Sequence, residues 1–506
     1  MEDNIQKITT NKKTTHRPIV LTAIVIGMFM AAIEATIVAT AMPNIVADLG
    51  GFSLYSWVFS IFLFMQAITI PIYGKLADLY GRKPVYIAGV TIFLIGSVLC
   101  GLATTMPLLI VFRFIQGLGA GAVQPIATTI VGDIYTLEER AKVQGYLASV
   151  WGISAIIGPT LGGIFVEFLH WKWIFWINVP FGILSLLGII FFLHERITPK
   201  KQVIDYVGAI LLFMSVTGVM IAFIQGGVAW SWLSLESFLF FFLFIVGFLL
   251  FLRQEKRAKE PIMPLSIWKN QLIIFANIGS LTTGMIMIAV MSVIPTYVQG
   301  TMGQSAIVGG FTLAVMSIGW PISSTIAGKI LIKIGFMKTA FIGGCFLIIG
   351  AIFLLFSVPA YGPVMPGLGS FLIGAGMGFS TTTYIVSIQS NVKWDIRGVA
   401  TATNAFMRIL GNTMGVALAG ALLNSRLLSY LEEHAPEAAE SHGLGLADAL
   451  LDSLQQEHLP KDVLSILQEG LATSVHTVFW FLIILAVITL ICNCFLPNKV
   501  TKVDGK

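Results

Sequence analysis

Long apolar stretches alternate with short polar ones along almost the whole chain. A helix needs roughly 20 mostly apolar residues to cross a bilayer, and fourteen stretches of about that length are present. They lie at residues 19–42, 54–74, 85–103, 107–132, 142–166, 173–194, 206–226, 236–252, 271–297, 305–328, 339–358, 365–390, 399–424 and 473–496. We therefore expect an all-α membrane protein with 14 transmembrane helices.

Lysine and arginine fall mostly on alternate connections between these stretches. They gather at residues 1–18, 75–83, 253–269 and 497–506, among other connections on the same side. Positive residues near the spans stay cytoplasmic, so both tails, 1–18 and 497–506, should be cytoplasmic and the number of spans even. The first apolar stretch is too long for a usual secretory signal, and we expect it to be retained.

Composition agrees with this pattern. Of the 506 residues, 56% are hydrophobic, only 11% are charged and 50 are glycine. The net charge of +5 reflects membrane topology, and no basic cluster predicts nucleic-acid binding. Four cysteines lack metal-ligand spacing, so we interpret them as packing residues and expect no metal site. They are Cys100, Cys345, Cys492 and Cys494.

The chain contains a weak internal repeat. Gly74-Lys75 followed by Gly81 recurs as Gly328-Lys329 followed by Gly335. Parallel repeats of this kind build transporters from two six-helix halves. The two copies lie further apart than six spans need, which indicates two inserted helices and a 6+2+6 arrangement. The predicted parts are a half at 19–194, an insertion at 195–270, and a half at 271–496 with an extracellular loop, a solvated cap or linker, at 425–471.

Glu34 is the only acidic residue deep inside an apolar stretch. An ionisable group at membrane depth is rarely found without a proton, ion or substrate task. Arg113 lies at a similar depth, since the two residues are roughly 12 and 9 Å from the outer ends of their stretches. Movement of Arg113, or entry of water, would switch Glu34 between its protonated and charged forms. The alternative to such a switch is that Glu34 and Arg113 form a static buried ion pair. The repeat position of Glu34 is Ile288, so proton chemistry should belong to the first half.

The connection after residue 74 has the strongest local motif, GKLADLYGRKP. Gly74 and Gly81 permit a tight turn, Asp78 can face a helix N-terminus, and Arg82 holds the connection on the cytoplasmic side. This spacing closely resembles the signature loop of the major facilitator superfamily.

Three further motifs narrow the resemblance. Residues 113–119 resemble the superfamily's arginine motif, residues 158–163 the motif of its antiporter branch, and residues 171–180 the start of the sixth span in fourteen-span drug:proton antiporters. With residues 34–38, the resemblance covers nearly the whole chain. Position 34 is often Asp in that family and is Glu here, which changes the reach of the carboxylate.

The resemblance implies the major facilitator fold and a conformational role for several small residues. Gly158, Pro159 and Gly162 are first explained by close helix packing and a bend. By resemblance they belong to a gate, together with the residues of the GKLADLYGRKP motif.

Polar and polarizable side chains within the spans are candidates for a substrate cavity. Met and aromatic residues would suit lipophilic cations, with Glu34 supplying attraction. The candidates are Trp57, Gln66, Gln116, Trp151, Met291, Tyr384, Asn404 and Phe406, with Gln124, Asn277 and Met287 beside them. Arg408 also lies within a span, and a pairing role and a transport role are equally open.

The leading hypothesis is a monomeric multidrug efflux antiporter of the cell membrane. It would export hydrophobic, often cationic, drugs in exchange for protons by alternating access, with no cofactor beyond the proton gradient. Antiport of a metal chelate, a monovalent cation, or an endogenous metabolite or lipid would use the same fold. A membrane enzyme is not expected, because the seven histidines are scattered. A receptor or scaffold would not need the GKLADLYGRKP loop motif or the arginine motif at residues 113–119.

Overall fold

The computed structural model describes residues 15–50, 54–195, 205–226, 230–304, 306–436 and 461–497, and these ranges contain helices but no strand. The first half comprises α1 (Arg17–Leu49), α2 (Tyr55–Tyr80), α3 (Arg82–Gly101), α4 (Met106–Ile134), α5 (Leu137–Phe168), the short α6 (Trp173–Trp176) and α7 (Asn178–Phe192). The next two helices are α8 (Tyr206–Gln225) and α9 (Leu235–Glu255).

The second half comprises six long helices. They are α10 (Gln271–Thr296), α11 (Ala306–Ile334), α12 (Phe336–Leu355), α13 (Val364–Asn391), α14 (Arg397–His434) and α18 (Lys461–Cys494). Short helical turns lie at Ile267–Lys269, Tyr297–Thr301, Pro359–Tyr361 and Trp394–Ile396. The ends of the predicted loop 425–471 are thus helical, and residues 437–460 lie outside the described ranges.

The all-helical membrane fold is confirmed. Thirteen stretches of the described chain are long and apolar enough to cross a bilayer. They match the expected spans except the fifth, which falls on α5 and is not among the thirteen. This helix begins with four charged residues within 138–142, which lower its apolar character. The count of fourteen spans therefore stays a prediction.

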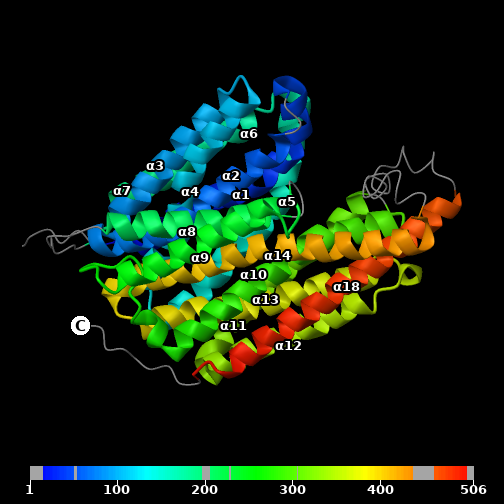
Figure 1. Cartoon of the computed structure of the whole chain (residues 1–506). Coiled ribbons are helices and arrows are strands. Elements are labelled where there is room, and N and C mark those ends of the chain that lie inside the picture. The colour runs from blue at the N-terminus through cyan, green and yellow to red at the C-terminus, as the bar shows by residue number, and fades with distance from the viewer. Residues whose placement is uncertain are drawn as a thin grey trace, which may run out of the picture.

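The helices pack as two six-helix bundles (Figure 1). In the first bundle α1 packs on α5 and α7, and α4 on α2 and α3; in the second, α13 packs on α11 and α12, and α14 on α10 and α18. The bundles meet mainly where α5 packs on α11 and where α2 packs on α14, with further contacts of α4 with α14 and of α5 with α13. They approach closely at the end near both described termini and diverge toward the other end. We call these the closed end and the open end. The pair α8 and α9 lies beside α2 and α14.

The internal repeat has a geometric reason. Gly81 ends α2 with φ of 95°, and Gly335 ends α11 with φ of 88°. Both conformations lie in the left-handed region, which side chains other than glycine rarely adopt. The amide of each glycine donates to a carbonyl four residues earlier, Ala77 in one case and Leu331 in the other. The same tight reversal therefore joins the second and third helices of each half.

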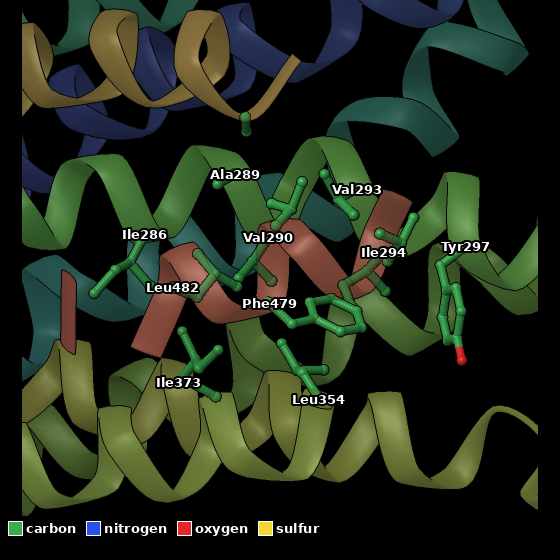
Figure 2. Close-up of a cluster of buried hydrophobic side chains, with 14 of the residues drawn as sticks. Ile286, Ala289, Val290, Val293, Ile294, Tyr297, Leu354, Ile373, Phe479 and Leu482 are labelled. Atoms are coloured by element: carbon green, nitrogen blue, oxygen red, sulfur yellow. The ribbon is translucent and has the colours of Figure 1, made fainter. Parts of the chain in front are cut away.

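Each half has its own apolar core. Figure 2 shows part of the second core, where Phe479 and Leu482 of α18 lie among Val290 of α10, Leu354 of α12 and Ile373 of α13. All five side chains are essentially buried. Because lipid tails are as apolar as these residues, close packing rather than transfer from water stabilises helix association in a bilayer.

Candidate functional site

Glu34 lies in the middle of α1 with its side chain completely buried. Arg113 of α4 donates from Nη1 to Glu34 Oε1, forming an ion pair. Asn178, the first residue of α7, donates from Nδ2 to Glu34 Oε2 at 2.6 Å. The structure thus brings the two ionisable residues together, and a third helix supplies an amide to the same carboxylate.

Further hydrogen bonds complete this network. Arg113 Nη1 also donates to Gln116 Oε1 at 2.7 Å, and Gln116 Nε2 donates to Ser97 Oγ at 3.2 Å. Ser97 Oγ accepts from Asn178 Nδ2 at 2.9 Å and donates to the Phe175 carbonyl at 2.8 Å. The buried charges are therefore paired and hydrogen-bonded, as the low dielectric of a helix bundle demands. We call Glu34, Arg113, Gln116, Asn178 and Ser97 the ion-pair network.

Arg113 also faces α2. Its Nε donates to the Val58 carbonyl at 3.1 Å, and its guanidinium lies 4.1 Å from the centre of the Phe62 ring. A desolvated cation–π contact of this kind contributes about 2 kcal/mol. Phe62 in turn lines a cavity, so one aromatic ring separates the arginine from that space.

The central cavity lies between the two halves and has a volume of about 1410 Å³. Its wall comes mainly from α2, α5, α10, α11 and α14 and is rich in aromatic and methionine side chains. Along α14 it extends from Arg408 to Glu432, roughly 36 Å by helical rise. Because Glu432 is exposed near the end of α14, the cavity reaches the open end. The ion-pair network does not contribute to its wall.

The structure separates the substrate candidates into two groups. Gln66 of α2, Trp151 of α5 and Met291 of α10 line the central cavity, as do Gln124 and Met287. Sequence reasoning missed other members of the wall, including the large aromatic residues of α2, α8–α9 and α11. Nothing in their spacing distinguishes them from aromatic residues that face lipid.

The other candidates lie elsewhere. Trp57 is 37% exposed at the start of α2, and Phe406 is buried in an apolar cluster that α14 shares with α2, α8 and other helices. The Tyr384 hydroxyl donates to Asn493 Oδ1, linking α13 to α18. Asn404 Nδ2 donates to Ser280 Oγ at 2.7 Å and to Asn277 Oδ1 at 3.1 Å, linking α14 to α10. None of these side chains belongs to the wall of the central cavity.

Asp78 fastens the two halves together at the closed end. Its carboxylate accepts from the backbone amides of Gly398 at 2.9 Å and Val399 at 2.8 Å, at the N-terminus of α14. It also pairs with Arg82 Nη2 at 2.8 Å. A carboxylate is well placed there, because free amides and the helix dipole favour negative charge. We call the contacts of Asp78 and Arg82 the closed-end lock.

Arg82 extends the lock and is 1% exposed. Its Nε pairs with Asp133 Oδ2 at 2.8 Å, its Nη2 donates to the Trp394 carbonyl at 2.7 Å, and its guanidinium lies 3.9 Å from the centre of the Trp394 ring. Arg397 pairs with the second oxygen of Asp133 at 2.6 Å. Asp78 and Asp133 of the first half therefore both bind the start of α14, which lies more than 260 residues further along the sequence.

Small residues permit these approaches. A Cβ on Gly74 would clash with Ala402 and would lie 3.0 Å from the Gly398 carbonyl, so glycine is required where α2 meets α14. A Cβ on Gly158 would clash with the Thr36 hydroxyl, so α5 approaches α1 there. Gly162 lies buried on the same helix. Pro159 is also part of α5, but its side chain is outside the described part of the structure.

Over the described ranges, no group of three or more His, Cys, Asp or Glu residues could hold a metal ion. The structure has three features that could serve transport. These are a sealed carboxylate with a guanidinium partner, a large apolar cavity open at one end, and a polar lock at the other end.

Comparison with known proteins gives a family. A model of the Major Facilitator Superfamily matches residues 24–416. The chain is 36% identical over 504 residues to multidrug resistance protein 3 of Bacillus subtilis (strain 168), with 98% of each chain covered. It is 32% identical over 520 residues to the multidrug transporter protein MdtP of the same organism, covering 98% of this chain and 96% of that one.

Solved structures agree on the fold. The human organic anion transporter MFSD10 aligns with a TM-score of 0.63 at 13% identity, covering 94% of this chain and 99% of that chain. At this identity the likeness shows the fold alone. The chain therefore belongs to the major facilitator superfamily and is a multi-pass membrane transporter, not an enzyme.

Proposed function

We propose that this protein is a proton-driven multidrug efflux antiporter of the cell membrane that works as a monomer. The observation that carries the proposal is the buried Glu34–Arg113 pair, separated from a large apolar cavity by the single ring of Phe62. The names of the two Bacillus relatives support drugs as cargo. The cavity wall, rich in aromatic and methionine residues, suits hydrophobic compounds of varied shape.

The direction of transport follows from the predicted topology. If both termini are cytoplasmic, the closed-end lock faces the cytoplasm and the central cavity faces the outside. In that state drug leaves the cavity and Glu34 takes up a proton. Opening of the lock would then expose the cavity to the cytoplasm, where Glu34 releases its proton and the next drug binds.

Helix α2 offers a physical connection between proton binding and the lock. Arg113 contacts Val58 and Phe62 near one end of α2, and Asp78 lies near the other end, roughly 24 Å from Phe62 by helical rise. Protonation of Glu34 removes the charge that pairs with Arg113, so the guanidinium shifts its interactions toward α2. A tilt of this helix changes the distance between Asp78 and α14. Proton binding therefore favours one state through differential contacts.

Transport in liposomes tests the proposal. The wild-type protein should drive a hydrophobic fluorescent dye against its gradient when a pH gradient is imposed, and dye addition should release protons. Glu34→Gln keeps the shape and hydrogen-bonding capacity of the side chain but cannot lose a proton. We expect this variant to fold and bind dye but to lose both activities. Glu34→Asp, which restores the acid, should recover part of the exchange.

Glu167→Gln is the matched control, because it removes an acid from an exposed position of α5 in the same half. It should exchange dye and protons at the wild-type rate. Unchanged exchange by Glu34→Gln would refute the proton role of Glu34. Sodium or potassium gradients, imposed without a pH gradient, separate drug antiport from monovalent-cation antiport.

A further inference from the structure

Arg408 of α14 lines the central cavity without an acidic partner. Arg82, Arg113 and Arg397 each pair with a carboxylate, whereas Arg408 forms no ion pair with any acid of the described ranges. A cation at membrane depth is costly unless it pairs or serves a transport pathway. Its environment therefore points to a partner that arrives with the cargo.

Two further hydrogen-bond donors, from Trp151 and Gln144, line a recess beside Arg408. A small recess of about 40 Å³ adjoins the central cavity, and the two share Gln124, Ala148, Trp151, Trp320 and Arg408 in their walls. Trp151 Nε1 is buried and has no hydrogen-bond partner in the described structure.

Gln144, which also lines the recess, is only 6% exposed, and its Nε2 has no partner among the described atoms. An indole N–H and a guanidinium can only donate, and an amide NH₂ donates as well. Leaving such a buried donor unsatisfied costs about 1–3 kcal/mol.

The hydroxyl groups of the recess do not satisfy these donors. Thr128 and Thr381 donate to carbonyls of their own helices, at 2.8 and 2.7 Å, and Ser324 and Thr382 bond each other. The recess therefore lacks an acidic acceptor while holding a cation and two unpartnered donors. The group that would complete it is a small anion.

The charges of the central cavity agree with this chemistry. Its only other charged residues in the described chain are Arg426 and Glu432, both exposed at the open end. The deep part thus carries one positive charge and no negative charge. Glu34, which the sequence suggested as an attraction for cations, is buried against Arg113 and does not reach the wall.

We propose that Arg408, Trp151 and Gln144 form an anion subsite that binds the carboxylate of an amphipathic organic acid. The recess has room for one small polar group, since a cavity needs only about 10–15 Å³ of such space to hold a water molecule. The apolar part of the substrate then lies in the central cavity against Trp320 and Met291. The inference rests on the proposed export function and narrows its cargo to hydrophobic acids, in place of the hydrophobic cations that the sequence predicted.

A matched pair of probes tests the subsite: 1-pyrenebutyrate and its methyl ester, which differ only in the charged group. Binding to purified protein in nanodiscs is followed by quenching of tryptophan fluorescence, with empty nanodiscs as the blank. A charge-assisted bond in a dry site predicts that the wild type binds the acid roughly 10- to 100-fold more tightly than the ester. Arg408→Gln should reduce this preference to within about 3-fold. Arg408→Lys keeps the charge but loses the planar fork, so it should retain part of the preference.

Two other variants sharpen the result. Arg426→Gln removes the same charge from the same helix at the exposed mouth, where solvent screens it, and should change the preference by less than about 3-fold. Trp151→Phe keeps an aromatic ring but removes Nε1, and should weaken acid binding roughly 5-fold more than ester binding. This variant carries the test if Arg408→Gln does not fold.

Equal binding of acid and ester by the wild type, or an unchanged preference in Arg408→Gln and Trp151→Phe, would overturn the subsite. Export assays in liposomes keep this failure distinct from failure of the antiport proposal. If antiport is wrong, a pH gradient moves neither probe faster than in protein-free liposomes, while the binding preference persists. If only the subsite is wrong, the gradient drives both probes above the protein-free rate without a preference that depends on Arg408.

Discussion

Replacing Asp78 by asparagine should open the closed end more often. The Asp78 carboxylate is 2% exposed and accepts from the amides of Gly398 and Val399 while pairing with Arg82. Asparagine has nearly the same shape but is neutral and has only one acceptor oxygen. One α14 amide would then face the side-chain NH₂ group, and Arg82 would lose one of its two carboxylate partners.

The size of the effect follows from these contacts. Hydrogen bonds to a charged group contribute about 1.5–3 kcal/mol each, and a neutral replacement bond contributes about 1 kcal/mol. Loss of two charged contacts with partial replacement gives a change of about 2 kcal/mol in favour of the open lock. Since about 1.4 kcal/mol corresponds to a factor of ten, the equilibrium should shift roughly 30-fold.

Thiol labelling measures this equilibrium. Thr401 is 4% exposed and lies two residues after Val399 on α14, about half a helical turn, so a cysteine there is protected while the lock is closed. In a background without the four native cysteines, a polar maleimide should label Thr401→Cys roughly 30-fold faster when Asp78→Asn is present. Asp395→Asn, an exposed change of the same charge at the same end, should leave the rate as it is. Labelling rates within about 3-fold of each other for Asp78→Asn and its parent would refute the lock.

Changes at Gly158 and Glu139 of α5 give two further predictions. Gly158→Ala would force its Cβ against the Thr36 hydroxyl, and this overpacking should lower the free energy of unfolding by about 1–3 kcal/mol and lower Tm. Gly163→Ala is the control, because its Cβ meets no described atom within 4 Å. Its Tm should match or exceed that of the wild type. If both alanines lower Tm equally, contact with α1 is not the cause. The Glu139 carboxylate accepts from the Thr136 amide in a capping box, and this bond is the main cause that lowers its pKa below the ordinary 4.5. Its stabilisation is present above pH 4.5 and lost as pH falls through the lowered pKa, so the Tm difference between wild type and Glu139→Gln should vanish in acid; a difference that grows in acid would contradict the cap.

Much of the fold could be predicted from the sequence because the bilayer imposes its thickness on every helix. The depth of Glu34 and Arg113, counted along two apolar stretches, also indicated that the two could meet. The position of Asp78 in its motif predicted a helix N-terminus as its neighbour. One amide that Asp78 binds, that of Gly398 in the first turn of α14, lies 320 residues away, and only tertiary packing shows which helix supplies it.

The rotation of each helix about its axis was much harder to predict. In a soluble protein a polar face identifies the exposed side, but lipid and bundle interior are both apolar. Gln66 and Asn404 therefore look alike in the sequence, yet one lines the central cavity and the other fastens α14 to α10. The sequence was equally ambiguous for Tyr384, a substrate candidate whose hydroxyl donates to Asn493 of α18 and does not line the central cavity. Unpartnered donors, such as Trp151 Nε1, become visible only once neighbouring helices are placed.

The two halves share a repeat but differ in their buried charges. In the proposed exchange, the first half would therefore bind the proton and the second half the anionic group of the substrate. The repeat position of Glu34 is Ile288, which lines the central cavity, whereas Glu34 itself is sealed against Arg113. The second half instead presents Arg408 to the cavity without a carboxylate of its own. A proton that neutralises Glu34 and an acid that pairs with Arg408 would therefore bind at separate places, so that coupling between them must pass through helix movement. Phe62 of α2, with Arg113 on one side and the cavity on the other, is where that movement would be transmitted.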